Sequence, residues 1–144
     1  MSCLQKESGT NSLNNYLLDS FALLRLIQKE PGAEAVKDIL DEARGGKARA
    51  MLNVMNLGEI IYTVQRRFGH QAKLDVIKSI NLIDIIILPV PNDLVFRAAE
   101  LKAQFSMFYA DAFAVASAIE HSATVVTGDP EFRQVEHLVG IHWV

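Results

Sequence analysis

Two kinds of segment alternate along most of the chain: short apolar runs and longer stretches with apolar residues at helical spacing. The first kind predicts buried strands and the second predicts amphipathic helices. We expect strands at residues 16–18, 50–54, 83–90, 124–127 and 140–144. Helices are expected at residues 20–30, 33–43, 59–68, 71–80, 92–105, 109–122 and 130–135. Strands and helices that alternate in this way predict a single α/β domain with a central, mostly parallel sheet and helices on both faces.

The first fifteen residues do not share this pattern. They are mostly polar and lack the apolar centre of a signal peptide, so we interpret residues 1–15 as a disordered leader before a domain at residues 16–144. No apolar run approaches the about 20 residues that cross a bilayer, which excludes a membrane protein of the helical type. The single cysteine, Cys3, excludes an internal disulfide and makes a reducing cytoplasm the expected compartment.

Acidic residues occur at several of the predicted strand–helix junctions. Asp19 and Asp129 each follow an apolar strand, Glu59 opens a predicted helix, and Asp111 interrupts the apolar run at residues 110–119. In a parallel sheet the carboxyl ends of the strands lie along one edge, where ligands bind. Carboxylates gathered there would repel one another and would require a hard divalent cation such as Mg²⁺ or Mn²⁺. The pattern therefore predicts a metal-dependent site for phosphoryl transfer.

Most of these acids also have a structural explanation. Asp19 and Asp129 fit helix N-caps, and Asn56 with Glu59 fits a capping box. Asp111 has no comparable structural explanation, because its neighbours at residues 108–115 provide no cation to pair with it. A buried carboxylate without a partner shifts its pKa or binds a metal ion. The joint pattern favours a functional site, and capping and metal binding can coexist.

Four motifs resemble those of a known family. They are Tyr-Leu-Leu-Asp-Ser at 16–20, Asn-x-x-Glu at 56–59, Tyr-Ala-Asp-Ala-Phe-Ala-Val-Ala-x-Ala at 109–118 and Val-Thr-Gly-Asp-Pro-Glu-Phe at 126–132. Together they resemble a PIN domain, and within that family the VapC-type ribonuclease toxins of toxin–antitoxin pairs. The resemblance covers nearly all residues after the leader. It implies a catalytic and metal-binding quartet of Asp19, Glu59, Asp111 and Asp129, with Ser20, Asn56 and Thr127 as polar support.

The expected function is therefore a Mg²⁺- or Mn²⁺-dependent endoribonuclease, in which the quartet holds one or two cations for in-line displacement at phosphorus. A net charge of −3 is unusual for a free-standing nucleic-acid binder, but bound metal would neutralise the site locally. The resemblance also implies an antitoxin partner and a homodimer. The amphipathic residues 59–68 are a candidate dimer surface, although an ordinary core-facing helix is the preferred interpretation of this stretch.

Two other functions compete with this one. The first is a catalytically silent PIN-like module that serves dimerisation or partner docking. The second is a phosphatase with Asp19 as nucleophile, which ranks last because Phe21 occupies the position where such enzymes commonly have a second acid. Ser20 lacks a plausible histidine partner, so a hydrolase triad is not expected.

Overall fold

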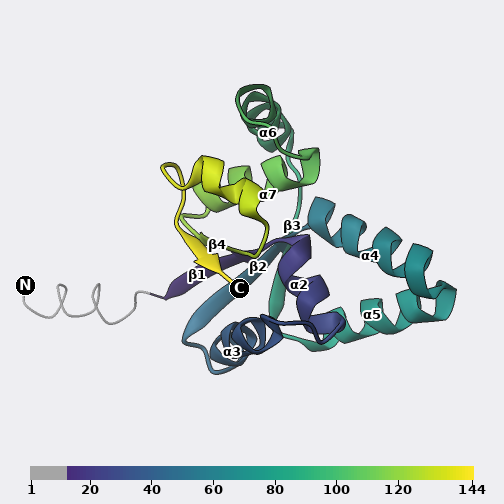
Figure 1. The fold of residues 1–144 in the computed structure, drawn as a ribbon. Helices are drawn as coiled ribbons and strands as arrows, with labels where there is room; N and C mark the ends of the chain where they lie inside the picture. The colour runs from purple at the N-terminus through teal and green to yellow at the C-terminus, as the bar shows by residue number, and fades with distance from the viewer. Residues whose placement is uncertain (1–12) are drawn as a thin grey trace, which may run out of the picture.

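The five strands form one sheet in the computed structural model, which describes residues 13–144 (Figure 1). The strands are β1 (Asn14–Leu18), β2 (Ala48–Asn53), β3 (Ile85–Leu88), β4 (Thr124–Thr127) and β5 (Ile141–Trp143). Their order is β3-β2-β1-β4-β5, and every pair is parallel. The fold class is confirmed, with a sheet that is parallel throughout. β1 begins two residues before the predicted domain boundary, and residues 1–12 of the predicted leader, Cys3 included, lie outside the described residues.

Seven helical segments connect the strands, as the sequence predicts. They are α2 (Ser20–Ile27), α3 (Ala33–Arg44), α4 (Val54–Phe68), α5 (His70–Leu82), α6 (Asn92–Gln104), α7 (Tyr109–Glu120) and the 3-10 helix η1 (Pro130–Val135). Most bounds lie within three residues of the predicted ones. β3 is shorter than predicted because α5 extends to Leu82 and because Pro89 and Pro91 have no amide hydrogen for the ladder.

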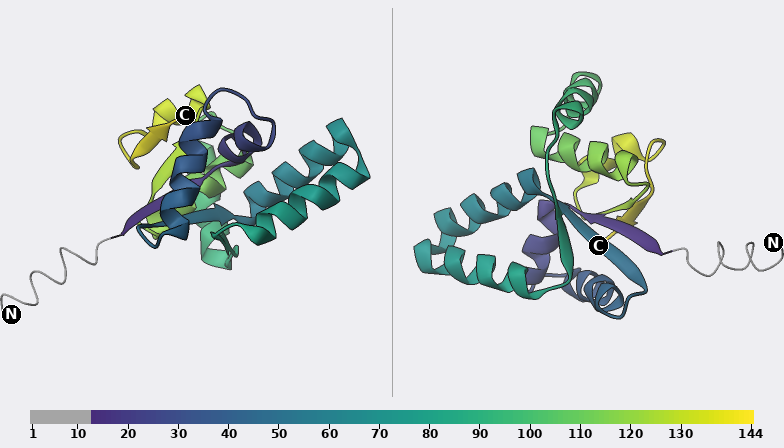
Figure 2. Two further views of the ribbon diagram at one scale, coloured as in Figure 1. Left: turned by 90° about the horizontal axis from the view of Figure 1, so that it is seen from below. Right: turned by 180° about the vertical axis from the view of Figure 1, so that it is seen from behind.

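Helices cover both faces of the sheet (Figure 2), and an apolar core lies on each face. On one face, Leu17, Met51 and Val125 pack with the apolar sides of α6, α7 and η1. The neighbouring residues in the strands point to the other face, where Leu18 and Leu52 pack with α2, α3, α4 and α5. Alternation along each strand therefore divides the helices between two layers, as expected for a parallel sheet buried on both sides.

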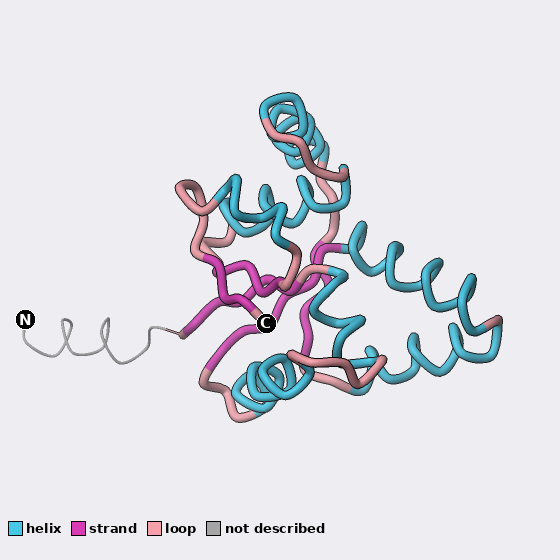
Figure 3. Tube along the Cα trace, in the orientation of Figure 1, coloured by secondary structure: helices cyan, strands magenta, loops and turns pink. Residues whose placement is uncertain are grey.

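The start of α4 differs from the prediction. Asn53, the last residue of β2, is the N-cap: its Oδ1 accepts a hydrogen bond from the amide of Met55 at 2.8 Å, and its Nδ2 donates to Ser117 Oγ at 2.8 Å. The predicted capping box of Asn56 and Glu59 is therefore wrong. Asn56 is buried in the first turn of α4, and Glu59 lies in the second turn. The strand passes into the helix without a loop, as the tube in Figure 3 shows.

Helices α4 and α5 form a hairpin that projects from the sheet (Figures 1 and 2). The turn between them is Gly69, whose φ of +96° lies in the region that favours glycine. Ile60 and Val64 of α4 face the core, whereas Tyr62 is 53% exposed. Within residues 13–144, no helix combines the length and the apolar composition that a membrane span requires.

Candidate functional site

All four predicted acids line one open cavity of about 200 Å³ at the carboxyl edge of the sheet. Asp19 follows β1, Asp129 follows Gly128 and β4, Glu59 comes from α4, and Asp111 comes from the first turn of α7. The rest of the lining consists of Ser20, Phe21, Leu24, Thr63 and Phe108. The structure thus brings together segments that are far apart in the sequence, at the edge where parallel α/β proteins bind ligands.

Asp19 is held rigidly at the end of the central strand. It is 1% exposed, and its Oδ1 accepts a hydrogen bond from the amide of Ala22 at 2.8 Å, which makes it the N-cap of α2. Its Oδ2 accepts a hydrogen bond from the Thr127 hydroxyl at 2.5 Å. Each carboxylate oxygen retains capacity for a further partner. The N-cap predicted for Asp19 is confirmed, and this role does not remove the carboxylate from the cavity.

Thr127 links two of the acids. Its hydroxyl donates to Asp19 and also accepts a hydrogen bond from the amide of Asp129 at 3.0 Å. Asp129 in turn is the N-cap of η1, because its Oδ1 accepts from the amide of Glu131 at 2.9 Å. A side chain at Gly128 would collide with the ring of Phe21, so glycine is required for this close packing.

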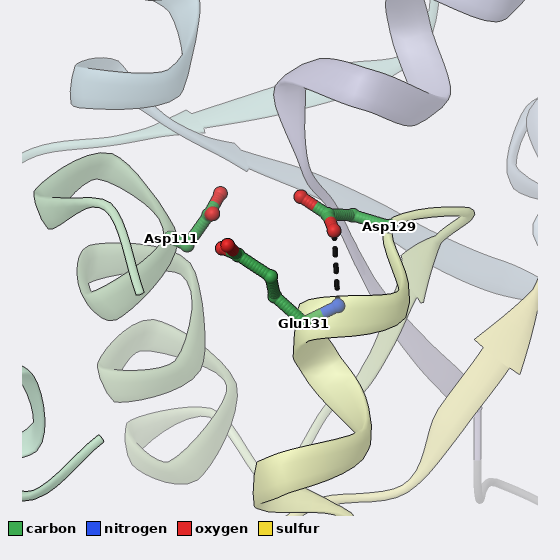
Figure 4. A group of neighbouring side chains, drawn as sticks. All are labelled: Asp111, Asp129 and Glu131. Carbon is green, nitrogen blue, oxygen red and sulfur yellow. Dashed lines mark hydrogen bonds between the residues drawn. The ribbon is translucent and has the colours of Figure 1, made fainter. Parts of the chain in front are cut away.

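The tightest acidic group contains one residue that the sequence interpretation missed. Asp111, Asp129 and Glu131 point toward one another (Figure 4), and a carboxylate oxygen from each lies within 4.8 Å of the other two. Glu131 follows Asp129 by two residues, in the first turn of η1. The spacing Asp-Pro-Glu was its only sequence signal. Asp19 and Glu59 line the same cavity but do not belong to this group.

Glu131 also carries an unsatisfied oxygen. Its Oε2 is buried and has no hydrogen-bond donor among the described residues. A buried carboxylate oxygen that no donor satisfies is energetically costly, and two neighbouring carboxylates raise that cost. The oxygen is therefore available as a ligand for a cation or as an acceptor for an ordered water molecule.

Burial and mutual repulsion raise the pKa values of two acids in the cavity. Burial raises the pKa of Asp111 to about 8, and the negative charges of Asp19, Asp129, Glu59 and Glu131 add to this rise. Burial likewise raises the pKa of Asp19 to about 7, although its hydrogen bonds from Thr127 and Ala22 oppose the rise. Both carboxyl groups are thus held partly protonated near neutral pH for want of a counter-charge.

No lysine or arginine of the described chain lines the cavity. The side chain of Arg25 lies over the ring of Phe21, with 4.5 Å between Cζ and the ring centroid, but it forms an ion pair with Glu30 at 3.3 Å. The charged groups that line the cavity are therefore all carboxylates, and oxygen ligands of this kind suit a hard divalent cation. Oxygens bound to one Mg²⁺ at about 2 Å lie up to about 4 Å apart, so the group at Asp111 needs only small side-chain movements.

The polar support residues hold the walls of the cavity together. Ser20 Oγ donates to the carbonyl oxygen of Asn56 at 3.1 Å, and Asn56 Nδ2 donates to the carbonyl oxygen of Ala110 at 3.1 Å. Asn56 therefore joins α2, α4 and α7 immediately before Asp111, although it does not line the cavity itself. Of the predicted support residues, only Ser20 lies on the cavity surface.

Solved structures of toxin–antitoxin proteins share this fold. VapBC2 from Rickettsia felis, bound to a promoter DNA fragment, aligns with a TM-score of 0.70 and 21% identity over 90% of this chain and 98% of the other. DNA-bound VapBC from Salmonella typhimurium aligns with a TM-score of 0.72 and 16% identity over 91% of this chain and 98% of the other. Mycobacterium tuberculosis VapC20, described as a sarcin-ricin loop cleaving toxin, aligns with a TM-score of 0.68 and 18% identity over 83% of this chain and 94% of the other.

At these identities the structural likeness shows the fold alone. Among curated protein sequences, none matches the chain. The sequence itself provides the family, because residues 16–138 match the model of the PIN domain. That match includes every residue that lines the cavity, from Asp19 to Asp129, and also Glu131. The chain therefore belongs to the PIN domain family.

Proposed function

We propose that this protein is a ribonuclease that depends on a divalent cation, Mg²⁺ or Mn²⁺. The observation that carries the proposal is the group of Asp111, Asp129 and Glu131, of which Asp111 is buried and the other two are partly buried. Among residues 13–144, no cation forms an ion pair with this group and no donor reaches Glu131 Oε2. Carboxylates that repel one another destabilise the metal-free protein, and a bound cation would remove this repulsion. Membership of the PIN family and the likeness to a toxin named for cleaving the sarcin-ricin loop support RNA as substrate.

The residues divide into two sets by their position. Asp111, Asp129 and Glu131 would hold the cation directly, and Asp19 and Glu59 would bind a second ion or the waters around it. A bound cation would lower the pKa of a water and stabilise the oxygens around phosphorus during in-line displacement. Asp19 Oδ1 and Oδ2 are each fixed by one hydrogen bond, so this carboxylate can orient a donor with little loss of side-chain entropy.

Chelation provides the first test of this function. Purified protein should cleave single-stranded RNA in Mg²⁺ or Mn²⁺, lose that cleavage in excess chelator, and regain it when the cation is restored. Without the cation, nothing in the cavity neutralises the acids, lowers the pKa of the attacking water or stabilises the charge on the phosphoryl oxygens. Products would be resolved by gel electrophoresis of end-labelled RNA. Cleavage that persists in chelator would contradict the mechanism. Metal binding without any cleavage would favour the catalytically silent docking module instead.

We further propose that the protein is the toxin of a toxin–antitoxin pair, acting in the cytoplasm as a homodimer. The likeness to VapBC structures supports an antitoxin partner. Exposed apolar side chains on α4, such as Met55 and Phe68, can supply part of a dimer surface, whereas Ile60 is buried in the core and cannot.

Co-expression with the neighbouring gene tests this assignment. The protein should elute as a dimer and should co-purify with a small partner that suppresses RNA cleavage. Light scattering coupled to size-exclusion chromatography measures the mass of the complex. A monomer that retains no partner would contradict the toxin assignment and would leave the nuclease assignment intact.

A further inference from the structure

One face of α4 leads out of the acidic cavity. Glu59 and Thr63 line the cavity, and Arg66 follows Glu59 by seven residues, which is nearly two full helical turns. At 3.6 residues per turn, these three side chains share one face of α4, and Arg66 lies about 10 Å farther along the axis. This part of α4 belongs to the hairpin that projects from the sheet (Figures 1 and 2).

Arg66 is paired with an aromatic ring instead of a carboxylate. Its Cζ lies 5.7 Å from the ring centroid of Tyr62, one turn earlier, and that ring is 53% exposed. Arg66 is itself exposed and forms no ion pair with any residue from 13 to 144. Its guanidinium therefore keeps donors free while the ring restricts its position.

Electrostatic repulsion explains why a nuclease would need an arginine side chain beside the acidic cavity. The charged residues that line the cavity are all acids, so a phosphodiester chain that approaches it is repelled until a metal ion neutralises the site. The strand on either side of the cleaved bond gains nothing from a metal ion in the cavity. A fixed arginine within a few nucleotides of the cavity would offset this repulsion along the flanking strand.

The aromatic ring points to single-stranded RNA. A cation in the last turn of a helix also stabilises the helix dipole, but that role does not require an exposed tyrosine beside it. Tyrosine next to arginine provides a stacking surface for a base and a contact for the adjacent phosphate, the combination that binds single strands. Phe108, 68% exposed on the cavity wall, offers a second ring at the near end of the same path.

We propose that Tyr62 and Arg66 form a subsite for single-stranded RNA that flanks the bond cleaved in the acidic cavity. Tyr62 stacks on a base and Arg66 binds a phosphate oxygen, so that the strand runs along α4 from the cavity toward the end of the hairpin. This inference rests on the proposed ribonuclease function. It goes beyond that function by assigning the path of the bound RNA strand along α4 and two residues that contact the strand.

Binding of a fluorescently labelled, mixed-sequence single-stranded RNA tests the subsite, measured by anisotropy in the Asp111→Asn background so that the probe stays intact. Tyr62→Ala should weaken binding about tenfold, because a stacked base is lost, whereas Tyr62→Phe should retain most of the affinity. Arg66→Gln should weaken binding and reduce the slope of log affinity against log salt by about 0.7, as expected for one lost phosphate contact.

Two matched variants serve as controls. Arg49→Gln removes another exposed arginine, from β2, that forms no ion pair among residues 13–144, and Phe96→Ala removes a 69% exposed side chain from α6. Neither should change the affinity or the salt slope. Affinities of Tyr62→Ala and Arg66→Gln that equal those of the controls would overturn the subsite and leave this face to a protein partner.

The cleavage assay separates failure of the subsite from failure of the proposed function. With Asp111 restored, Arg66→Gln and Tyr62→Ala should raise KM at nearly unchanged kcat, since they act on binding alone. If the parent protein cleaves RNA and these variants match it in KM, the subsite is wrong and the ribonuclease assignment stands. If the parent protein binds the RNA probe through Tyr62 and Arg66 but cleaves nothing, the subsite stands and the catalytic assignment fails.

Discussion

Replacing Asp111 with asparagine should reduce RNA cleavage more than a hundredfold. Loss of a residue that only supports a metal ligand costs about 10- to 100-fold, and Asp111 is proposed to bind the cation itself. Its carboxylate is also repelled by the charges of four neighbouring acids, Asp19, Asp129, Glu59 and Glu131. Initial rates of cleavage at saturating Mg²⁺ and at saturating Mn²⁺ measure the effect. The folded state should persist, because asparagine keeps the size of the side chain and removes a repelled charge.

Glu131→Gln should give a loss in the same range, since Glu131 stands in the same three-membered group. The matched control is Glu34→Gln, which removes an exposed carboxylate from the first turn of α3 and should leave the rate unchanged. If Glu131→Gln behaves like Glu34→Gln while Asp111→Asn is inactive, Glu131 does not bind the cation. If all three variants are active, the cavity is not the catalytic site.

The fold was predictable because the hydrophobic pattern is consistent with the local signals. Apolar pairs such as Leu17 and Leu18 point to opposite faces of the sheet, and each finds a separate core. A continuous apolar strand of this kind indicates a sheet covered on both sides. The convergence of Asp19 and Asp129 followed from the same reasoning, because both stand at the carboxyl ends of parallel strands that pair side by side.

The start of α4 could not be predicted from local sequence. Asn53 and Asn56 are separated by one helical turn, and either could cap a helix. A tertiary contact decides between them, because Asn53 Nδ2 reaches Ser117 on α7. Asn56 then becomes an interior residue that fixes Ala110, the residue before Asp111. The motif at 56–59 thus positions the site without being a capping box.

Glu131 shows a second limit of the sequence. Glu131 follows the N-cap Asp129 and Pro130, and an acid in the first turn of a helix is favourable without any functional role. Whether its side chain turns toward solvent or toward Asp111 depends on the packing of η1 against α7, which no local pattern describes. Tyr62 presents the same difficulty, because its neighbour Ile60 on α4 is buried whereas Tyr62 is exposed.

The metal-free protein should lose stability as the pH rises from about 4 to about 8. Asp111 and Asp19 have pKa values of about 8 and about 7 when folded, above the ordinary value of 3.8 that applies when unfolded. Between these limits the folded state binds more protons than the unfolded state, so each rise in pH favours unfolding. Thermal melts in chelator, recorded across this range, should therefore show a falling melting temperature that levels off above about pH 8.

Added Mg²⁺ or Mn²⁺ should reverse this trend, because a cation competes with protons for the same oxygens and binds best when the carboxyl groups are ionised. Binding to the folded state alone stabilises it by about 2.7 kcal/mol at a hundredfold excess over Kd, so the metal-induced rise in melting temperature should grow with pH. Asp111→Asn provides the control: its melting temperature in chelator should depend less on pH, and its response to metal should be smaller. Equal metal-induced shifts in both proteins at pH 8 would place the cation away from Asp111, and a metal-free protein that gains stability with pH would contradict the repulsion inferred for the cavity.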